Sequence, residues 1–185
     1  MTSMQEREYI KTRDSYYRLN CDLKAQLRGD SSVIVNDEIE KVHDLFTEIT
    51  EYNNSLINKY PFLQLSEYET DNFVTWLDYM PDGWRIAFGL EMCEAIKKVI
   101  EGKKIKDYHI LEIKEKYGAL RWYDNKGDKD IDIIIAHYEK YSEETCIVCG
   151  EPAEYLSKGW ISPYCEKCKE ERSEKYRMSF EKINC

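Results

Sequence analysis

Apolar residues recur at helical spacing in several stretches of the chain, most regularly between residues 36 and 57. The apolar residues are Ile39, Val42, Leu45, Phe46, Ile49, Leu56 and Ile57, and the polar Asn53 follows the same spacing. Asn36 is a favourable N-cap, and Asp37 and Glu38 fall in the first turn, where the helix dipole favours acids. Pro61 predicts the end of this helix, because the residue before a proline avoids the helical conformation.

Three further helices are predicted by the same spacing rule. Residues 1–28 form the first, and the polar run 29–32 interrupts it. Residues 82–101 form another, with Asp82 as a capping residue and Gly102 as the C-terminal stop. Residues 131–141 form the last of the three. The tail, residues 170–185, consists mostly of helix-forming residues.

Between residues 107 and 123 the period of the apolar positions changes from helical to alternating, which is typical of strands. Tyr117 and Gly118 predict a turn, so the segment is expected to form a β-hairpin, followed by a loop over 124–128. An isolated hairpin is marginally stable, so a third strand is expected from the segment before Pro81 or from the C-terminal part. The pattern as a whole predicts an α+β fold that is mostly helical around a central hairpin.

Four cysteines near the C-terminus predict a zinc site. Cys146 and Cys149 form one Cys-x-x-Cys pair, and Cys165 and Cys168 form the second. Four thiolates at this spacing can surround one Zn²⁺ tetrahedrally, and a closed all-cysteine set is typical of structural zinc. The alternative is two disulfides or free thiols.

The surroundings of the two pairs favour a small treble-clef or zinc-ribbon-like module. Gly150 follows the first pair, where a tight turn often requires positive φ. Good helix formers follow the second pair, so its thiolates are expected at a helix N-terminus, where the dipole stabilises them. The intervening residues, 151–164, are enough for a short hairpin. We therefore divide the chain into an N-terminal helical extension (1–57), an α+β core (58–144) and a zinc module (145–185).

Composition narrows the function classes. The chain has 185 residues, 42% hydrophobic residues and a net charge of −9. No secretory segment opens it and no apolar run is long enough to span a membrane, so a cytoplasmic protein with reduced thiols is expected. Cys21, Cys93 and Cys185 have no evident partners, and the spacing predicts that Cys93 is a small core residue. The acidic charge disfavours general nucleic-acid binding.

Several motifs give the segment from Asn58 to Cys168 a resemblance to a family of small uncharacterised proteins encoded by bacteriophages and prophages. The motifs are residues 58–63, 80–85, 113–118, 120–123, 145–150 and 159–165. The family has no established activity, so the resemblance implies a phage context and a bacterial host cytoplasm rather than a mechanism. The resemblance marks these residues as motif positions: Trp84, Lys114, Glu115, Lys116, Gly118, Arg121, Trp122 and Trp160.

Some of these motif residues are candidates for binding an anionic ligand or partner. Lys114 and Lys116 share one face of the predicted strand, and Arg121 on the returning strand is expected near them. Trp84 or Trp122 would stack on a base while the cations hold phosphates. The structural alternative is a cross-strand ion-pair ladder in which Glu112 neutralises the cations.

No catalytic constellation is recognisable: there is no Ser-His-Asp arrangement, phosphate-binding glycine loop or HExxH motif. The favoured hypothesis is therefore a non-enzymatic phage accessory protein that binds a host protein or an anionic immune signal. The alternatives are a protein that sequesters a nucleotide-like small molecule, nucleic-acid binding through the zinc module and, least favoured, an enzyme. The sequence makes no prediction of oligomeric state.

Overall fold

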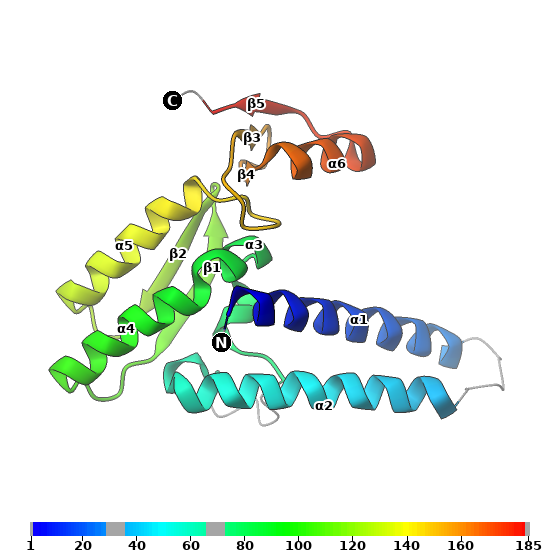
Figure 1. Ribbon diagram of the computed structural model, residues 1–185, viewed down its shortest axis with the longest axis horizontal. Helices are drawn as coiled ribbons and strands as arrows, with labels where there is room; N and C mark the ends of the chain where they lie inside the picture. Colours follow the sequence, from blue (N-terminus) through cyan, green and yellow to red (C-terminus); the bar gives the residue numbers. More distant parts are fainter. Residues whose placement is uncertain (1, 29–35, 66–72, 184–185) are drawn as a thin grey trace. The chain divides into compact units, whose positions relative to one another are not determined.

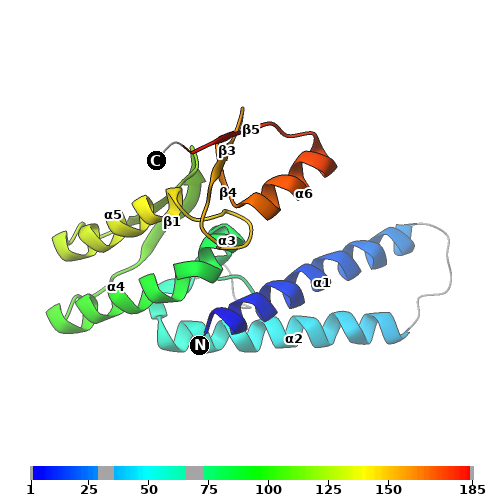
Figure 2. The same cartoon turned by 45° about the horizontal axis from the view of Figure 1, so that its top comes forward.

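The helical periodicity of the first sixty residues produces two long helices, α1 (Ser3–Arg28) and α2 (Asn36–Lys59), which lie side by side (Figures 1 and 2). The computed structural model describes residues 2–28, 36–65 and 73–183. Its chain forms two units, residues 1–75 and 76–185. The predicted division at 57/58 and 144/145 stays a prediction, because compactness alone does not show which pieces fold independently. The predicted break at 29–32 lies outside the described residues.

The first unit is held together by aromatic contacts between its two helices. Tyr9 stacks on Tyr52 with ring centroids 4.8 Å apart, and the Tyr52 hydroxyl donates to the buried carboxylate of Glu6. Phe73, which follows the helices, packs against both of them: it stacks on Phe46 of α2 at 5.1 Å and lies 4.8 Å from Tyr16 of α1, measured between ring centroids. After α2 ends at Lys59, the chain forms the short 3₁₀ turn η1 (Pro61–Leu63), which confirms the stop predicted from Pro61.

The second unit begins with η2 (Trp76–Tyr79) and a nearly continuous helical rod. The rod consists of α3 (Asp82–Trp84), a π-helical segment η3 (Arg85–Gly89) and α4 (Leu90–Lys103). Two predicted helix boundaries are wrong. The N-cap is Pro81 and Asp82 lies in the first turn, where an acid still favours the dipole. The C-cap is Lys104 in the left-handed conformation, so Gly102 lies inside the helix.

The predicted hairpin is confirmed as β1 (Ile110–Lys116) and β2 (Ala119–Asp124), joined by a turn in which Tyr117 and Gly118 both have positive φ. Ile113 pairs with Trp122, and Lys114 pairs with Arg121. The helix α5 (Lys129–Glu143) packs on β2. Its side chains also satisfy the outer edge of β2, because Leu120 N donates to Ser142 Oγ at 2.8 Å. Within the described residues this sheet has two strands, so the expected third strand is not found in it.

The C-terminal residues form a second, smaller sheet in the order β4-β3-β5, which Figure 1 shows beside α6 (Glu166–Tyr176). The strands are β3 (Tyr155–Ser157), β4 (Pro163–Tyr164) and β5 (Phe180–Lys182). The hairpin predicted between the cysteine pairs is β3–β4. The prediction of a mostly helical tail is wrong at its end: Arg177 in the left-handed conformation stops α6, and the chain returns to pair with β3.

The core of the second unit joins the rod, the hairpin and α5. Phe88 stacks on Tyr138 with ring centroids 5.3 Å apart, and Cys93 is fully buried, as its position predicted. Arg85 is also fully buried, where it pairs with Asp78 at 2.7 Å. The α+β fold with a central hairpin is thus confirmed. No described helix meets the length and apolarity that crossing a membrane requires.

Candidate metal centre

The first cysteine pair lies on a tight turn between α5 and β3. Gly150 N donates to Cys146 O at 3.0 Å, and Gly150 has the positive φ, +83°, that its position predicted. Cys146 N donates in turn to Glu151 O at 2.7 Å, which closes the loop on itself. The turn therefore presents both thiols of the pair from one short segment.

The second pair lies at the start of α6, as predicted. Cys165 is the N-cap residue and Cys168 is in the first turn, so both sulfurs are close to the positive end of the helix dipole. Ile147 N donates to Pro163 O at 2.9 Å, which fastens the first turn to the strand that leads into Cys165. Backbone contacts thus fix the two pairs relative to each other.

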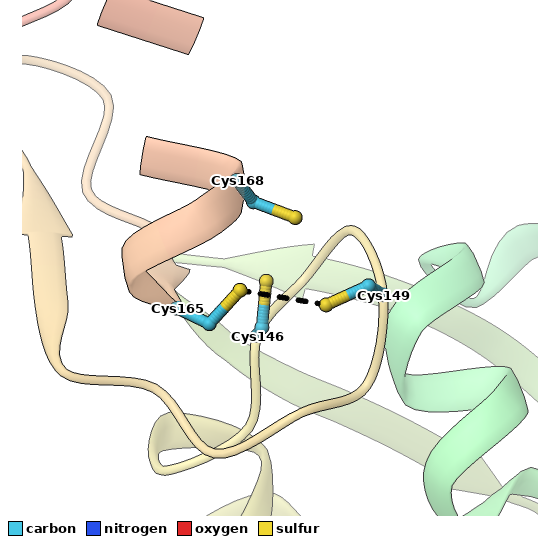
Figure 3. Close-up of side chains that lie close together, drawn as sticks. All are labelled: Cys146, Cys149, Cys165 and Cys168. Carbon is cyan, nitrogen blue, oxygen red and sulfur yellow. Dashed lines mark hydrogen bonds between the residues drawn. The ribbon is translucent and has the colours of Figure 1, made fainter. Parts of the chain in front are cut away.

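The four sulfur atoms converge on one point (Figure 3). All four Sγ atoms lie within 4.8 Å of one another, and Cys149 Sγ and Cys165 Sγ are 3.5 Å apart. A Zn²⁺ ion with Zn–S bonds of about 2.3 Å requires sulfur separations of about 3.8 Å. No disulfide joins these four cysteines, so the disulfide alternative is not the arrangement found. The donor set fits one tetrahedral, sulfur-binding metal ion.

The pKa values of the cysteines show that burial opposes ionisation of the thiols, which a bound cation would favour. Burial raises the pKa of the Cys146 thiol, but the backbone N–H groups of Cys165, Cys149 and Val148 stabilise the thiolate and hold its pKa below the ordinary value. Burial raises the pKa of Cys149 to about 11. Burial and the neighbouring charge of Cys146 also raise the pKa of Cys168. Four thiolates this close require a positive charge at their centre.

The cysteine turn is packed directly against the start of the helical rod, a relation that the sequence did not indicate. Gly83 N donates to Ile147 O at 3.0 Å, and Trp84 Nε1 donates to Thr145 O at 2.9 Å. A Cβ on Gly83 would lie 2.1 Å from Cys146 O, and one on Gly150 would lie 2.6 Å from Gly83 O. Only glycine allows the two backbones to approach this closely. The Asp82-Gly83-Trp84 motif therefore marks the place where the helical rod packs against the cysteine turn.

The hairpin cations are placed on one face, as expected, but carboxylates accompany two of them. Lys114 Nζ lies 2.5 Å from Glu112 Oε2, and Arg121 Nη1 lies 3.5 Å from Glu139 Oε2. Lys116 Nζ lies over the ring of its neighbour Tyr117, 5.6 Å from the centroid. Glu112 was predicted as the neutralising partner, whereas Glu139 on α5 is a partner that the strand pattern could not reveal.

The candidate aromatic residues lie in the core. Trp84 is fully buried, and Trp122 is 3% exposed with Nε1 donating to Tyr108 Oη at 3.3 Å. Neither indole offers a free face to a ligand in this structure. Trp160, a motif position of the resemblance, is 75% exposed, and its Nε1 donates to Glu115 Oε2 at 3.0 Å.

The fold and the site define an α+β protein with a four-cysteine centre able to hold one metal ion. Within the residues that the structure describes, no other cluster of His, Cys, Asp or Glu has this potential. Comparison of the chain with protein-family models, with curated proteins and with solved structures finds no match.

Proposed function

We propose that Cys146, Cys149, Cys165 and Cys168 hold one Zn²⁺ as a structural centre. The observation that carries the proposal is the convergence of four cysteine sulfurs within 4.8 Å, with no disulfide between them. Tetrahedral all-sulfur sites select zinc or an iron–sulfur cluster, and paired Cys-x-x-Cys turns of this kind are typical of zinc. The ion would supply the charge that lets four buried thiolates coexist and would fix the module to the Gly83 segment.

The protein is proposed to be a binding protein rather than an enzyme. Four cysteine ligands fill a tetrahedral coordination sphere, whereas catalytic zinc keeps a position for water or substrate. A stabilised module of this type supplies a rigid surface. The role is therefore to present such a surface to a partner.

The partner is proposed to be a protein of a bacterial host, with the chain acting as a phage accessory protein in the host cytoplasm. The motif resemblance supports the phage context. The ion pairs of Lys114 and Arg121 and the burial of Trp84 and Trp122 favour a protein partner over an anionic small molecule. Residues 145–185 carry seven acidic and seven basic side chains, a balance that does not favour nucleic acid.

Affinity capture from bacterial lysate tests this function. Tagged wild-type protein is compared with Cys165→Ser and with the matched control Cys21→Ser, whose cysteine is exposed and lies outside the centre. Mass spectrometry of retained proteins and small molecules, with metal analysis of the same samples, gives the readout. We expect about one zinc per wild-type chain, and one host protein retained by wild type and control but lost from Cys165→Ser.

Two outcomes would contradict the proposed function. Retention of only a small molecule or nucleic acid by wild type would replace the protein partner. Less than about half an equivalent of zinc, with the thiols oxidised in pairs, would remove the structural metal.

A further inference from the structure

A groove lies within the second unit, between the hairpin turn, the end of α5 and the sheet of the cysteine module. Its volume is about 720 Å³, within the range of ligand sites. Tyr117 and Gly118 line it from the turn, and Leu156, Ile161 and Ile183 line it from the module. Lys140, Glu143 and Glu144 form its polar rim. We refer to these residues as the hairpin–module groove.

The groove follows from a sheet that carries apolar residues on both faces. Successive residues of a strand point to opposite faces. Tyr164 and Phe180 lie on one face, packed edge to face with ring centroids 5.2 Å apart, within the cluster that contains the cysteines. The register places Leu156 opposite Glu181, so Leu156 and the continuation of β5 to Ile183 lie on the other face. Leu156 and Ile183 on that second face are half-buried and line the groove.

Two large aromatic side chains are exposed beside the groove: Tyr117 lines it, and Trp160 immediately precedes the lining residue Ile161. Tyr117 is 77% exposed and Trp160 is 75% exposed, although both are large enough to contribute strongly to a core. Glu115 accepts from Gly118 N at 2.6 Å and from Trp160 Nε1 at 3.0 Å, so one carboxylate fixes both the turn and the indole. Gly118 also lies against Ile161, whose carbonyl oxygen would be 3.2 Å from a Cβ at that position. Exposed aromatics beside an apolar pocket are typical of protein-binding hot spots.

The rim indicates the charge of the occupant. Lys140 pairs with Glu143 at 2.7 Å and also interacts electrostatically with the exposed Glu144, so two carboxylates share one ammonium group and this rim keeps a net negative charge. Glu144 also lies at the C-terminal end of α5, where the helix dipole disfavours an acid. A cation from a partner would relieve this repulsion.

We propose that the hairpin–module groove binds an extended segment of a partner protein that places an aliphatic side chain against Leu156 and Ile161 and a lysine or arginine against Glu144. This inference rests on the proposed binding function and names its surface and the chemistry of its ligand. A second copy of the chain fits less well, because each copy carries a net charge of −9 and would bring acid to acid.

The test uses zinc-loaded, nitrogen-15-labelled full-length protein and a set of short synthetic peptides. Each peptide carries one leucine flanked by lysine or arginine, and its matched control carries glutamate in place of the basic residues. We expect amide shifts in the basic set at Gly118, Ala153 and Leu156, with little response to the acidic set. Glu144→Lys should weaken binding about tenfold and reduce its salt dependence, because a rim attraction becomes a repulsion.

Glu174→Lys on α6 is the matched control, since it makes the same charge change at an exposed position outside the groove. Absence of binding at millimolar peptide, shifts centred elsewhere, or equal weakening by both variants would overturn the inference. Shifts at the groove that depend on protein concentration without peptide would assign it to a second copy and also overturn it. Zinc content, measured separately, distinguishes these outcomes from failure of the metal centre.

Discussion

The four cysteines and the three hairpin cations are both groups of side chains that repel one another when charged, and the structure resolves the two differently. Two of the cations meet carboxylates of the same unit, Lys114 with Glu112 and Arg121 with Glu139. The thiols converge from two turns until all four sulfurs lie within 4.8 Å, and backbone N–H groups stabilise the thiolate of Cys146. Cations that pair with carboxylates of the same unit stabilise the fold weakly. Four thiolates that converge on one point indicate a site for a bound cation.

The largest expected effect is the loss of folding stability when one of the four cysteines is replaced. Cys168→Ser, or removal of metal with a chelator, should lower the free energy of unfolding of the second unit by more than about 4 kcal/mol, because metal binding is coupled to folding. Denaturant unfolding measures it. The control Cys21→Ser should change stability by less than about 0.5 kcal/mol, as an exposed substitution usually does.

An equal, small effect of Cys168→Ser and Cys21→Ser would show that the thiols need no ion. The cysteines would then resemble the hairpin cations, and the proposed difference between the two groups would be wrong.

The next effect tests whether the cysteine turn is part of the core or an appendage. Gly83→Ala should destabilise the unit by about 3 kcal/mol or more, since the added methyl would overlap the backbone of Cys146 and separate the turn from the rod. Gly102→Ala is the matched control: it lies inside α4 with no atom within 4 Å of the new methyl. It should stabilise the helix by about 0.5–1 kcal/mol.

Thermal unfolding of the two alanine variants gives the comparison, with zinc content measured beside it. Loss of zinc in Gly83→Ala alone would connect the packing to the metal site. Similar stability of both variants would mean that the turn moves away from Gly83 at little cost, contrary to the close approach seen here.

How much of this could be read from the sequence depends on how local each relation is. The cysteine centre was predictable because each pair is set by its own turn, with Gly150 and the start of α6 as local signals. The hairpin and its turn at Gly118 were predictable for the same reason. Glu139, by contrast, reaches Arg121 from a helix packed across β2, and no periodicity in either segment indicates that contact.

The same distinction explains the errors. Trp84 and Trp122 had the residue type of a binding site, but packing between the rod, the hairpin and α5 places them in the core. The tail has helix-forming composition, yet pairing of residues 180–182 with β3 outweighs that propensity. Gly83 was part of a motif visible in the sequence. A glycine is required there because the backbone contacts a segment about sixty residues later in the chain, and only the structure shows that contact.

The smallest expected effect concerns the cations. Lys114→Ala and Arg121→Ala should each lower the free energy of unfolding by about 0.2–1 kcal/mol, the range for exposed pairs on a sheet surface. Partner binding should persist in both variants. A folded Arg121→Ala protein that loses its partner would instead move the binding surface to the hairpin face.

The central claim is that the four thiols hold one zinc ion, and X-ray absorption at the zinc edge tests it most directly. Purified full-length protein should contain about one zinc per chain with four sulfur neighbours near 2.3 Å and no oxygen or nitrogen ligand. A zinc-free protein, or a zinc shell containing water, nitrogen or fewer than four sulfurs, would contradict the account.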